Sequence, residues 1–174
     1  MMKRWVLLTV LVALGGCKRA PKPFSAAGYG FTLHGGWDGE LEHKKGFDHV
    51  VFSAFADDVA CIAQVFPGIT DPTGFFDGIV EEYHASDIAP ATLQTPLGVF
   101  LGRKFVAHLS SDNPLVKVGL ALGLPHGEIY ALHDQDALVV LSLLTPGKPE
   151  DQAIAREHCA GILASIHREA TPAK

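Results

Sequence analysis

The sequence predicts an α+β fold in which helices flank an antiparallel sheet, as an α/β/α sandwich. Most of the chain consists of short apolar runs separated by Gly, Pro, Asn and Asp, which is typical of strands joined by tight turns. One segment with helical spacing interrupts these runs, and an amphipathic segment follows the last of them. Strands in runs, with one helix inserted and another at the end, predict a sandwich built on an antiparallel sheet.

The β-rich runs give the expected strands in chain order. They are Tyr29–Leu33, Phe47–Phe55, Val59–Phe66, Thr92–Phe100, Arg103–Leu109, Val116–Leu122, Glu128–His133 and Ala137–Leu144. The second and third runs are separated by Asp57 and Asp58, which favour a hairpin. The last run is apolar at nearly every position, as expected of a central strand that is covered on both faces.

Two helices are predicted from capping signals and apolar spacing. The first is expected to begin at Asp71-Pro72-Thr73, where a capping carboxylate precedes a proline in the first turn. Its apolar face contains Phe75, Phe76, Ile79, Val80 and Tyr83. The second is expected from about Glu150 to His167. Its predicted buried stripe contains Ile154, Ala155, His158, Cys159, Ile162, Leu163 and Ile166.

The N-terminus has the features of an export signal. Two basic residues precede the apolar run Trp5–Leu14, which is too short to span a bilayer, for which roughly 20 apolar residues are needed. The run ends in Leu14-Gly15-Gly16-Cys17, which resembles the bacterial lipobox. That resemblance implies diacylglycerol on the sulfur of Cys17 and cleavage between Gly16 and Cys17.

The residues after Cys17 predict a tether at a membrane surface. Lys18, Arg19 and Lys22 would contact anionic lipid headgroups, each adding roughly 1 kcal/mol to binding. Lys18 stands where the inner-membrane retention signal of some Gram-negative bacteria has aspartate. By that resemblance we expect a lipid-anchored protein of the cell envelope, at the outer membrane and facing the periplasm.

These signals divide the chain into four parts. They are a signal peptide over residues 1–16, the lipidated cysteine and a flexible tether over 17–28, a single domain over 29–168 and a tail over 169–174. The net charge of −5 becomes more acidic once the basic signal is removed. An acidic domain without a basic stripe argues against a nucleic-acid partner.

Two cysteines remain once Cys17 is lipidated. In an exported chain, an even remainder favours a disulfide, here between Cys61 in a predicted strand and Cys159 in the last helix. The alternative is two buried free thiols that pack as small apolar side chains.

The sequence contains no recognisable catalytic motif. None of the nine histidines has the short spacing of a zinc site, so His126, Glu128 and His133 are only weak candidates for metal ligands, and no cofactor is expected. The Gly-x-Ser-x-Gly motif of nucleophilic serines is absent. These observations favour a protein that is not an enzyme.

Two stretches resemble a known family. Residues 28–37, from Gly28 to Trp37, resemble the opening of PsbP-like domains, which include DcrB-type bacterial lipoproteins. Residues 129–146 and 159–166 resemble their last hairpin and closing helix. The resemblance implies an accessory module without a shared catalytic set, docked against another envelope protein.

The residues themselves leave a second function open. It is the binding of a small ligand in a pocket between sheet and helix, lined by Gly119, Gly123 and the inner face of Phe75–Tyr83.

Overall fold

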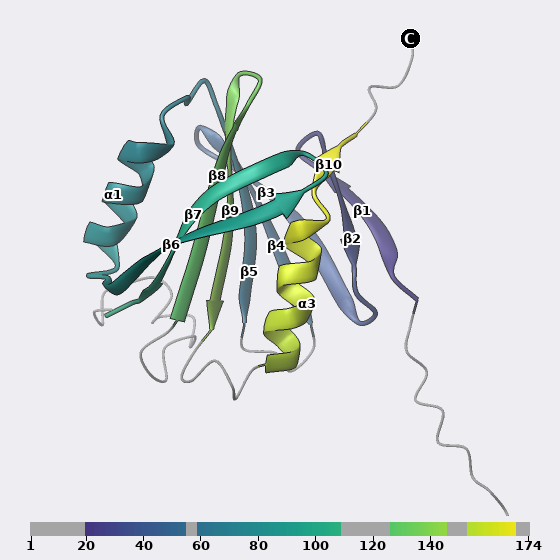
Figure 1. The fold of residues 1–174 in the computed structure, drawn as a ribbon. Helices are drawn as coiled ribbons and strands as arrows, with labels where there is room; N and C mark the ends of the chain where they lie inside the picture. Colours follow the sequence, from purple (N-terminus) through teal and green to yellow (C-terminus); the bar gives the residue numbers. More distant parts are fainter. Residues whose placement is uncertain (1–19, 55–58, 109–125, 146–152, 170–174) are drawn as a thin grey trace, which may run out of the picture.

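The computed structural model describes residues 20–54, 59–108, 126–145 and 153–169, which form ten strands and two helices (Figure 1). The strands are β1 (Lys22–Ala26), β2 (Tyr29–Leu33), β3 (Trp37–Lys44), β4 (Phe47–Ala54), β5 (Ala60–Pro67), β6 (Ser86–Thr95), β7 (Gly98–Val106), β8 (His126–Asp134), β9 (Ala137–Thr145) and β10 (His167–Arg168). The helices are α1 (Pro72–Glu82) and α3 (Ala153–Ala164).

Seven of the strands form one antiparallel sheet. Their spatial order is β3-β4-β5-β9-β8-β7-β6, so that two runs of strands that follow one another in the sequence meet where β5 pairs with β9. Val65 lies opposite Val139 in this central pairing. Every residue of β9 is buried, which confirms the prediction of a central strand covered on both faces.

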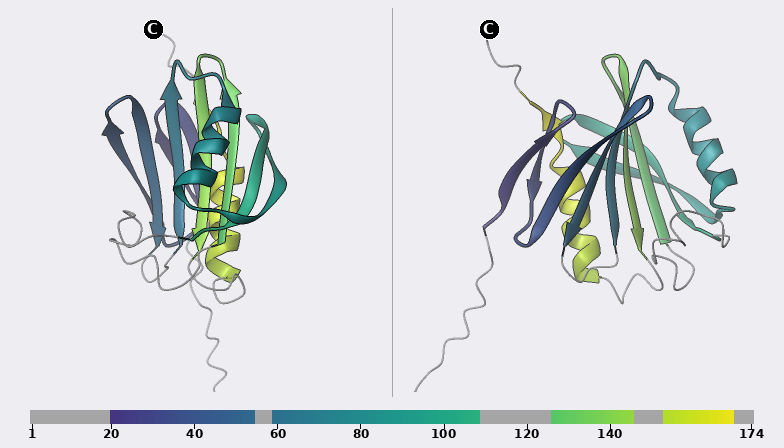
Figure 2. Two further views of the ribbon diagram at one scale, coloured as in Figure 1. Left: turned by 90° about the vertical axis from the view of Figure 1, so that its left-hand side faces the viewer. Right: turned by 180° about the vertical axis from the view of Figure 1, so that it is seen from behind.

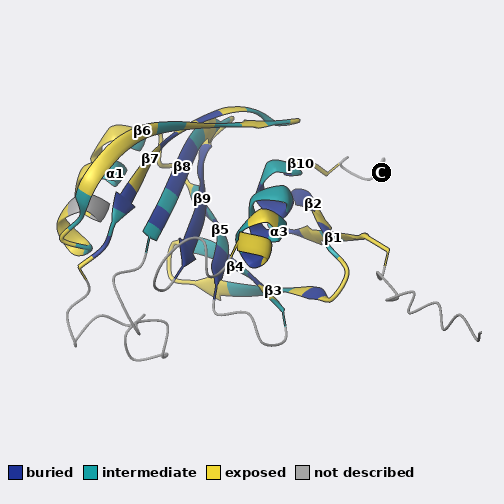
Figure 3. Cartoon of the chain, turned by 60° about the horizontal axis from the view of Figure 1, so that its bottom comes forward, coloured by how far each residue is buried: buried dark blue, intermediate teal, exposed yellow. Residues whose placement is uncertain are grey.

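Alternate residues of the large sheet belong to two different apolar clusters. Val139, Leu141 and Leu143 of β9 pack in one cluster with the buried face of α3. Leu138 and Val140 pack in the other, which also contains apolar residues of α1. The two helices therefore lie against opposite faces of the sheet, and their outer sides are exposed (Figure 3).

The predicted α/β/α sandwich is wrong, because the structure is predominantly β. Besides the seven-stranded sheet, a second sheet of three strands, in the order β1-β2-β10, packs beside α3. Within the described residues, helices contribute only α1 and α3. The sequence predicted that helix alone covers this face of the large sheet. Strands also cover it, because Phe31 and Leu33 of β2 are buried in the same cluster as α3.

The boundary between tether and domain also differs from the prediction. Lys22–Ala26, assigned to the flexible tether, forms β1 and pairs with β2 from Lys22 opposite Leu33 to Ala26 opposite Tyr29. Pro21 and Pro23 in the predicted tether suggested a spacer, but an edge strand tolerates proline because its outer N–H groups need no partner in the sheet. The strand at the other edge of this sheet is shorter still, since β10 is only His167–Arg168.

The helix α1 begins where the sequence predicts, whereas α3 ends at Ala164, before the predicted end at His167, which lies in β10. Asp71 accepts a hydrogen bond from the backbone N–H of Thr73 at 2.8 Å, which confirms the predicted cap of α1. The predicted stripe of α3 is buried at Cys159 and Ile162, whereas Ile154 is 71% exposed and does not belong to it. No helix in the described parts of the chain is long and apolar enough to cross a membrane.

The hairpin of β6 and β7 bends out of the plane of the sheet towards α3 (Figures 1 and 2). The sequence predicted one strand over Thr92–Phe100, but a turn separates β6 from β7 there, and the hydroxyl of Thr95 accepts hydrogen bonds from the N–H groups of Leu97 and Gly98. Leu93 and Leu97 pack on the cluster around α3, on the concave side of the hairpin. The opposite side of β7 faces the region of α1.

Candidate functional site

Several residues that the sequence singled out lie outside the described parts of the chain. They are the predicted lipidation site Cys17 and the predicted pocket glycines Gly119 and Gly123. Trp37 is only 1% exposed and is a core residue.

The three candidate metal ligands do not come together. His126 and Glu128 of β8 line one pocket beside Arg156 of α3, whereas His133 lines a groove beside α1, on the other face of the sheet. Within the described residues, no group of three or more His, Cys, Asp and Glu side chains could hold a metal ion.

Glu128 instead belongs to a charged network that joins α3 to the large sheet. Its carboxylate lies 2.5 Å from Nη2 of Arg156 and 3.2 Å from Nζ of Lys104, and it accepts a hydrogen bond of 2.6 Å from the hydroxyl of Tyr130. Burial by itself raises the pKa of Glu128, but the Tyr130 hydrogen bond and the charges of Lys104 and Arg156 outweigh it and hold that pKa below its ordinary value. The network keeps Glu128 ionised and is structural.

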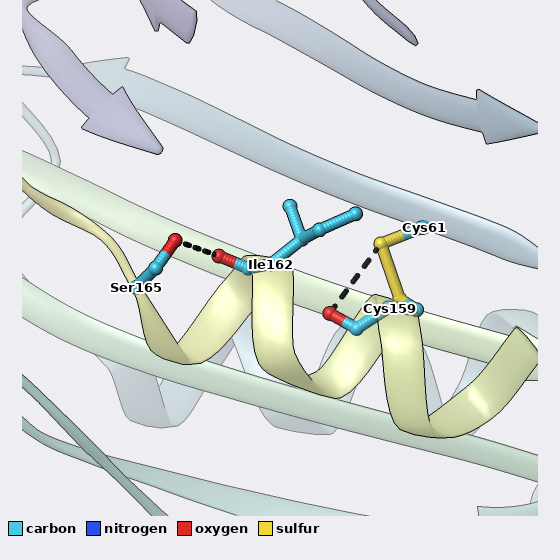
Figure 4. The surroundings of a disulfide bond; sticks show 4 residues. All are labelled: Cys61, Cys159, Ile162 and Ser165. Atoms are coloured by element: carbon cyan, nitrogen blue, oxygen red, sulfur yellow. Dashed lines mark hydrogen bonds between the residues drawn. A yellow bond between two sulfur atoms is a disulfide. The ribbon is translucent and has the colours of Figure 1, made fainter. Parts of the chain in front are cut away.

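Cys61 of β5 and Cys159 of α3 are joined by a disulfide (Figure 4). Their Cα atoms are 5.7 Å apart, and both side chains are fully buried. One turn further along the helix, the hydroxyl of Ser165 donates a hydrogen bond to the carbonyl of Ile162 at 2.7 Å. The disulfide fixes α3 to the face of the large sheet that lies opposite α1.

Two further pockets contain several charged groups that already have partners. A pocket of about 520 Å³ near the β8–β9 turn is bordered by Asp48, Arg168 and Glu169. His43 contacts Asp48, Asp134 contacts Arg168, and the hydroxyl of Ser25 donates to Glu169. The other, of about 420 Å³, contains the Glu128–Arg156 pair.

A groove of about 290 Å³ runs between α1 and strands β7 and β8, and we call it the α1 groove. Its apolar lining comes from Phe76 of α1, Ala131 and Leu132 of β8, and Val99 and Leu101 of β7. Its polar lining includes Asp77, Arg103 and His133. An apolar groove with a few polar side chains at its border is the general form of a binding site.

Two apolar side chains beside this groove are unusually exposed. Val99 is 45% exposed and Leu101 is 60% exposed. Leu101 lies opposite Ala131 on β8 and Thr92 on β6, so that only small side chains flank it in the sheet. The strand therefore presents an apolar surface that α1 does not cover.

Arg103 and Asp77 supply opposite charges at the groove. The guanidinium of Arg103 lies 5.4 Å from the ring centroid of Phe76 and donates a hydrogen bond to the carbonyl of Gly102. Both side chains are exposed, and neither forms an ion pair with another described residue. These charges are thus available to a binding partner.

The rest of the interface between α1 and the sheet is well packed. The ring of Phe75 lies 5.6 Å from that of Phe66, and Tyr83 stacks on Phe105 at 5.9 Å between centroids. The sequence predicted a pocket along the whole inner face of Phe75–Tyr83, and the groove is restricted to the part next to Phe76. No local sequence signal marks this groove, because it depends on how far α1 covers β7 and β8.

Comparison with known proteins identifies the fold. The cyanobacterial PsbP protein CyanoP from Synechocystis sp. PCC 6803 matches with a TM-score of 0.57 and 17% identity, over 91% of this chain and 99% of that one. The Ran-binding protein Mog1p of Saccharomyces cerevisiae matches with a TM-score of 0.51 and 11% identity, over 86% of this chain and 95% of that one. No family model and no curated protein matches the sequence. The chain therefore has a PsbP-like fold, as the sequence resemblance predicted.

Proposed function

We propose that this chain is a membrane-tethered module that binds another protein through the α1 groove. The observation that carries the proposal is the exposure of Leu101 beside a groove lined by Phe76 and Leu132. An exposed apolar surface next to a pocket is a feature of protein-binding sites, and Phe and Arg are enriched at protein interfaces.

The shared fold supports a protein partner. The similar structure from yeast is a protein whose name states that it binds Ran, and the similar cyanobacterial structure is a PsbP protein. Sequence identities of 11% and 17% carry over the architecture, so the partner of this chain has to be sought from its own surface.

The α1 groove is at the small end of the range of ligand-binding sites. Sites for drug-sized molecules enclose roughly 300–1,000 Å³. The groove has about 290 Å³, and the packed rings of Phe75 and Tyr83 close off the rest of the helix–sheet interface. This volume is sufficient for an apolar side chain from another protein.

The tether is proposed from the lipobox-like sequence at Cys17. Acylation there would hold the domain at the bilayer by two or three chains, and stable anchoring requires at least two such signals. We propose the outer membrane, facing the periplasm, as its location, because Lys18 follows the cysteine. β1 begins at Lys22, so that only a few residues would separate the acylated cysteine from the first strand.

The binding role can be tested by photo-cross-linking in cells that make the full chain. A photoreactive amino acid at Leu101 is expected to give an adduct with a protein. The same residue at Ile154, which is 71% exposed but lies on α3, is the matched control and is expected to give none. Equal labelling from both positions, or none from Leu101, would contradict the proposal.

The tether can be tested by labelling with a fatty acid. Label is expected in the native protein and not in Cys17→Ser, which should leave the membrane fraction. Retention of the label by Cys17→Ser would show that Cys17 is not the acylated residue.

A further inference from the structure

We infer that the protein bound at the α1 groove is a second copy of this chain, in a dimer with two-fold symmetry. The inference rests on the proposed function, which assigns protein binding to this groove, and it names the partner. A two-fold interface has to be self-complementary, because the same patch is used by both copies. The α1 groove and the strand beside it meet this requirement in shape and in charge.

The surface has an exposed apolar side chain, Leu101, directly beside the α1 groove. Leu101 is 60% exposed on β7 and projects from a strand whose flanking partners are Ala131 and Thr92. The groove next to it is lined by Phe76 and Leu132 and has room for an aliphatic side chain. In a two-fold dimer, Leu101 of each copy would enter the groove of the other, which buries both projections and fills both grooves.

The charges are complementary in the same way. Arg103 and Asp77 both line the groove, both are exposed, and neither has an ion-pair partner among the described residues. Arg103 of one copy would pair with Asp77 of the other, and the symmetry repeats the pair. A partner that carried only acidic side chains would be repelled by Asp77, and one that carried only basic side chains would be repelled by Arg103.

The net charge opposes dimerisation only weakly. The full sequence has a net charge of −5, and removal of the predicted signal makes it more acidic, but charges further apart than about 8 Å are screened at physiological ionic strength. Attachment of both copies to one membrane would raise their effective concentration, so that a small interface would be sufficient.

The test uses two copies of the full chain with different epitope tags, made in the same cells, and a photoreactive residue at Leu101. An adduct that carries both tags is expected. An adduct with another protein alone would overturn the dimer and leave the binding role of the groove in place, whereas the absence of any adduct would overturn both.

Charge reversal makes the test specific for the proposed pairing. Arg103→Asp in both copies, or Asp77→Arg in both copies, would place like charges together and is expected to lower the yield of the doubly tagged adduct roughly tenfold. One copy with Arg103→Asp and the other with Asp77→Arg restores both ion pairs, so the yield is expected to return. Failure of this mixed pair to regain the adduct, while Glu40→Arg leaves it unchanged, would overturn the inference.

Discussion

Gly102 of β7 lies so close to Ile129 of β8 that a Cβ atom at position 102 would be 2.3 Å from the carbonyl oxygen of Ile129. The same Cβ would also be 2.5 Å from the ring of Tyr130. The absence of a side chain at Gly102 thus sets the close approach of these two strands. Since Gly102 stands between Leu101 and Arg103, it also sets the position of two residues of the α1 groove.

The first prediction is that Gly102→Ala destabilises the protein by about 1–3 kcal/mol, as overpacking in a tightly packed region does. The backbone oxygen of Ile129 cannot move aside as a flexible side chain could. Gly78→Ala is the matched control, because no atom lies within 4 Å of a Cβ there and the residue is in α1. That variant is expected to gain about 0.5–1 kcal/mol. Urea unfolding of the two variants measures the difference, and equal stabilities would contradict the prediction.

The second prediction concerns the Glu128–Arg156 pair. The side chains are only 12% and 19% exposed, so Glu128→Gln would leave the guanidinium half-buried without its carboxylate. The expected loss of unfolding free energy is roughly 1–3 kcal/mol. Glu42→Gln, which breaks the exposed pair with Lys44, is the control and should have no measurable effect. A Glu128→Gln variant as stable as the native protein would show that the network contributes nothing.

The third prediction is a loss of stability in acid that depends on Glu128. Because the folded state holds the pKa of Glu128 below its ordinary value, the unfolded state takes up this proton first as the pH falls. The stabilisation is therefore complete well above pH 4.5, the ordinary pKa, and is lost as the pH falls below it. Unfolding curves at a series of pH values should show a shallower acid dependence for Glu128→Gln. Parallel profiles for the two proteins would be the contrary result.

The fourth prediction concerns the disulfide between Cys61 and Cys159. These residues are 98 positions apart, and a closed loop of about 100 residues stabilises a fold by roughly 4–5 kcal/mol in the chain-entropy model. Replacement of both cysteines by serine is expected to lower the unfolding free energy by this amount. Protein exported without reductant should have a denatured mass about 2 Da below that of its reduced form. Two free thiols in that sample would instead match the packing alternative.

The sequence predicted the elements that carry strong local signals. The apolar run Ala137–Leu144 became the central strand β9, and the Asp71-Pro72 cap became the start of α1, because a fully apolar strand and a capped helix are favoured by the chain itself. The likeness to PsbP-like domains was correct for the fold. These features depend on neighbours in the sequence.

What the sequence could not provide depends on contacts between distant segments. Lys22–Ala26 has the composition of a spacer, and only its pairing with β2 makes it a strand. Ile154 has the helical spacing of a buried residue, but it lies at the start of α3, beyond the surface that the helix buries. His133 and Glu128 are five positions apart in one strand, and strand alternation places them on opposite faces of the sheet.

The candidate site was missed for the same reason. Val99 was expected in the strand Thr92–Phe100 and Leu101 between two expected strands, and nothing local shows which part of β7 is left uncovered by α1. The groove arises from the packing of α1 against β7 and β8, and α1 is separated from both strands in the sequence by β6.

The central claim, a tethered module that binds protein through the α1 groove, is tested most directly by one comparison in cells. The photo-cross-linking yield from Leu101 is measured in the native chain and in Cys17→Ser, at equal amounts of exported protein. The account predicts a clear adduct in the native chain and a strong fall without Cys17, because loss of the tether lowers the local concentration of the partner. An equal yield in both would contradict the claim that the membrane tether is needed for binding.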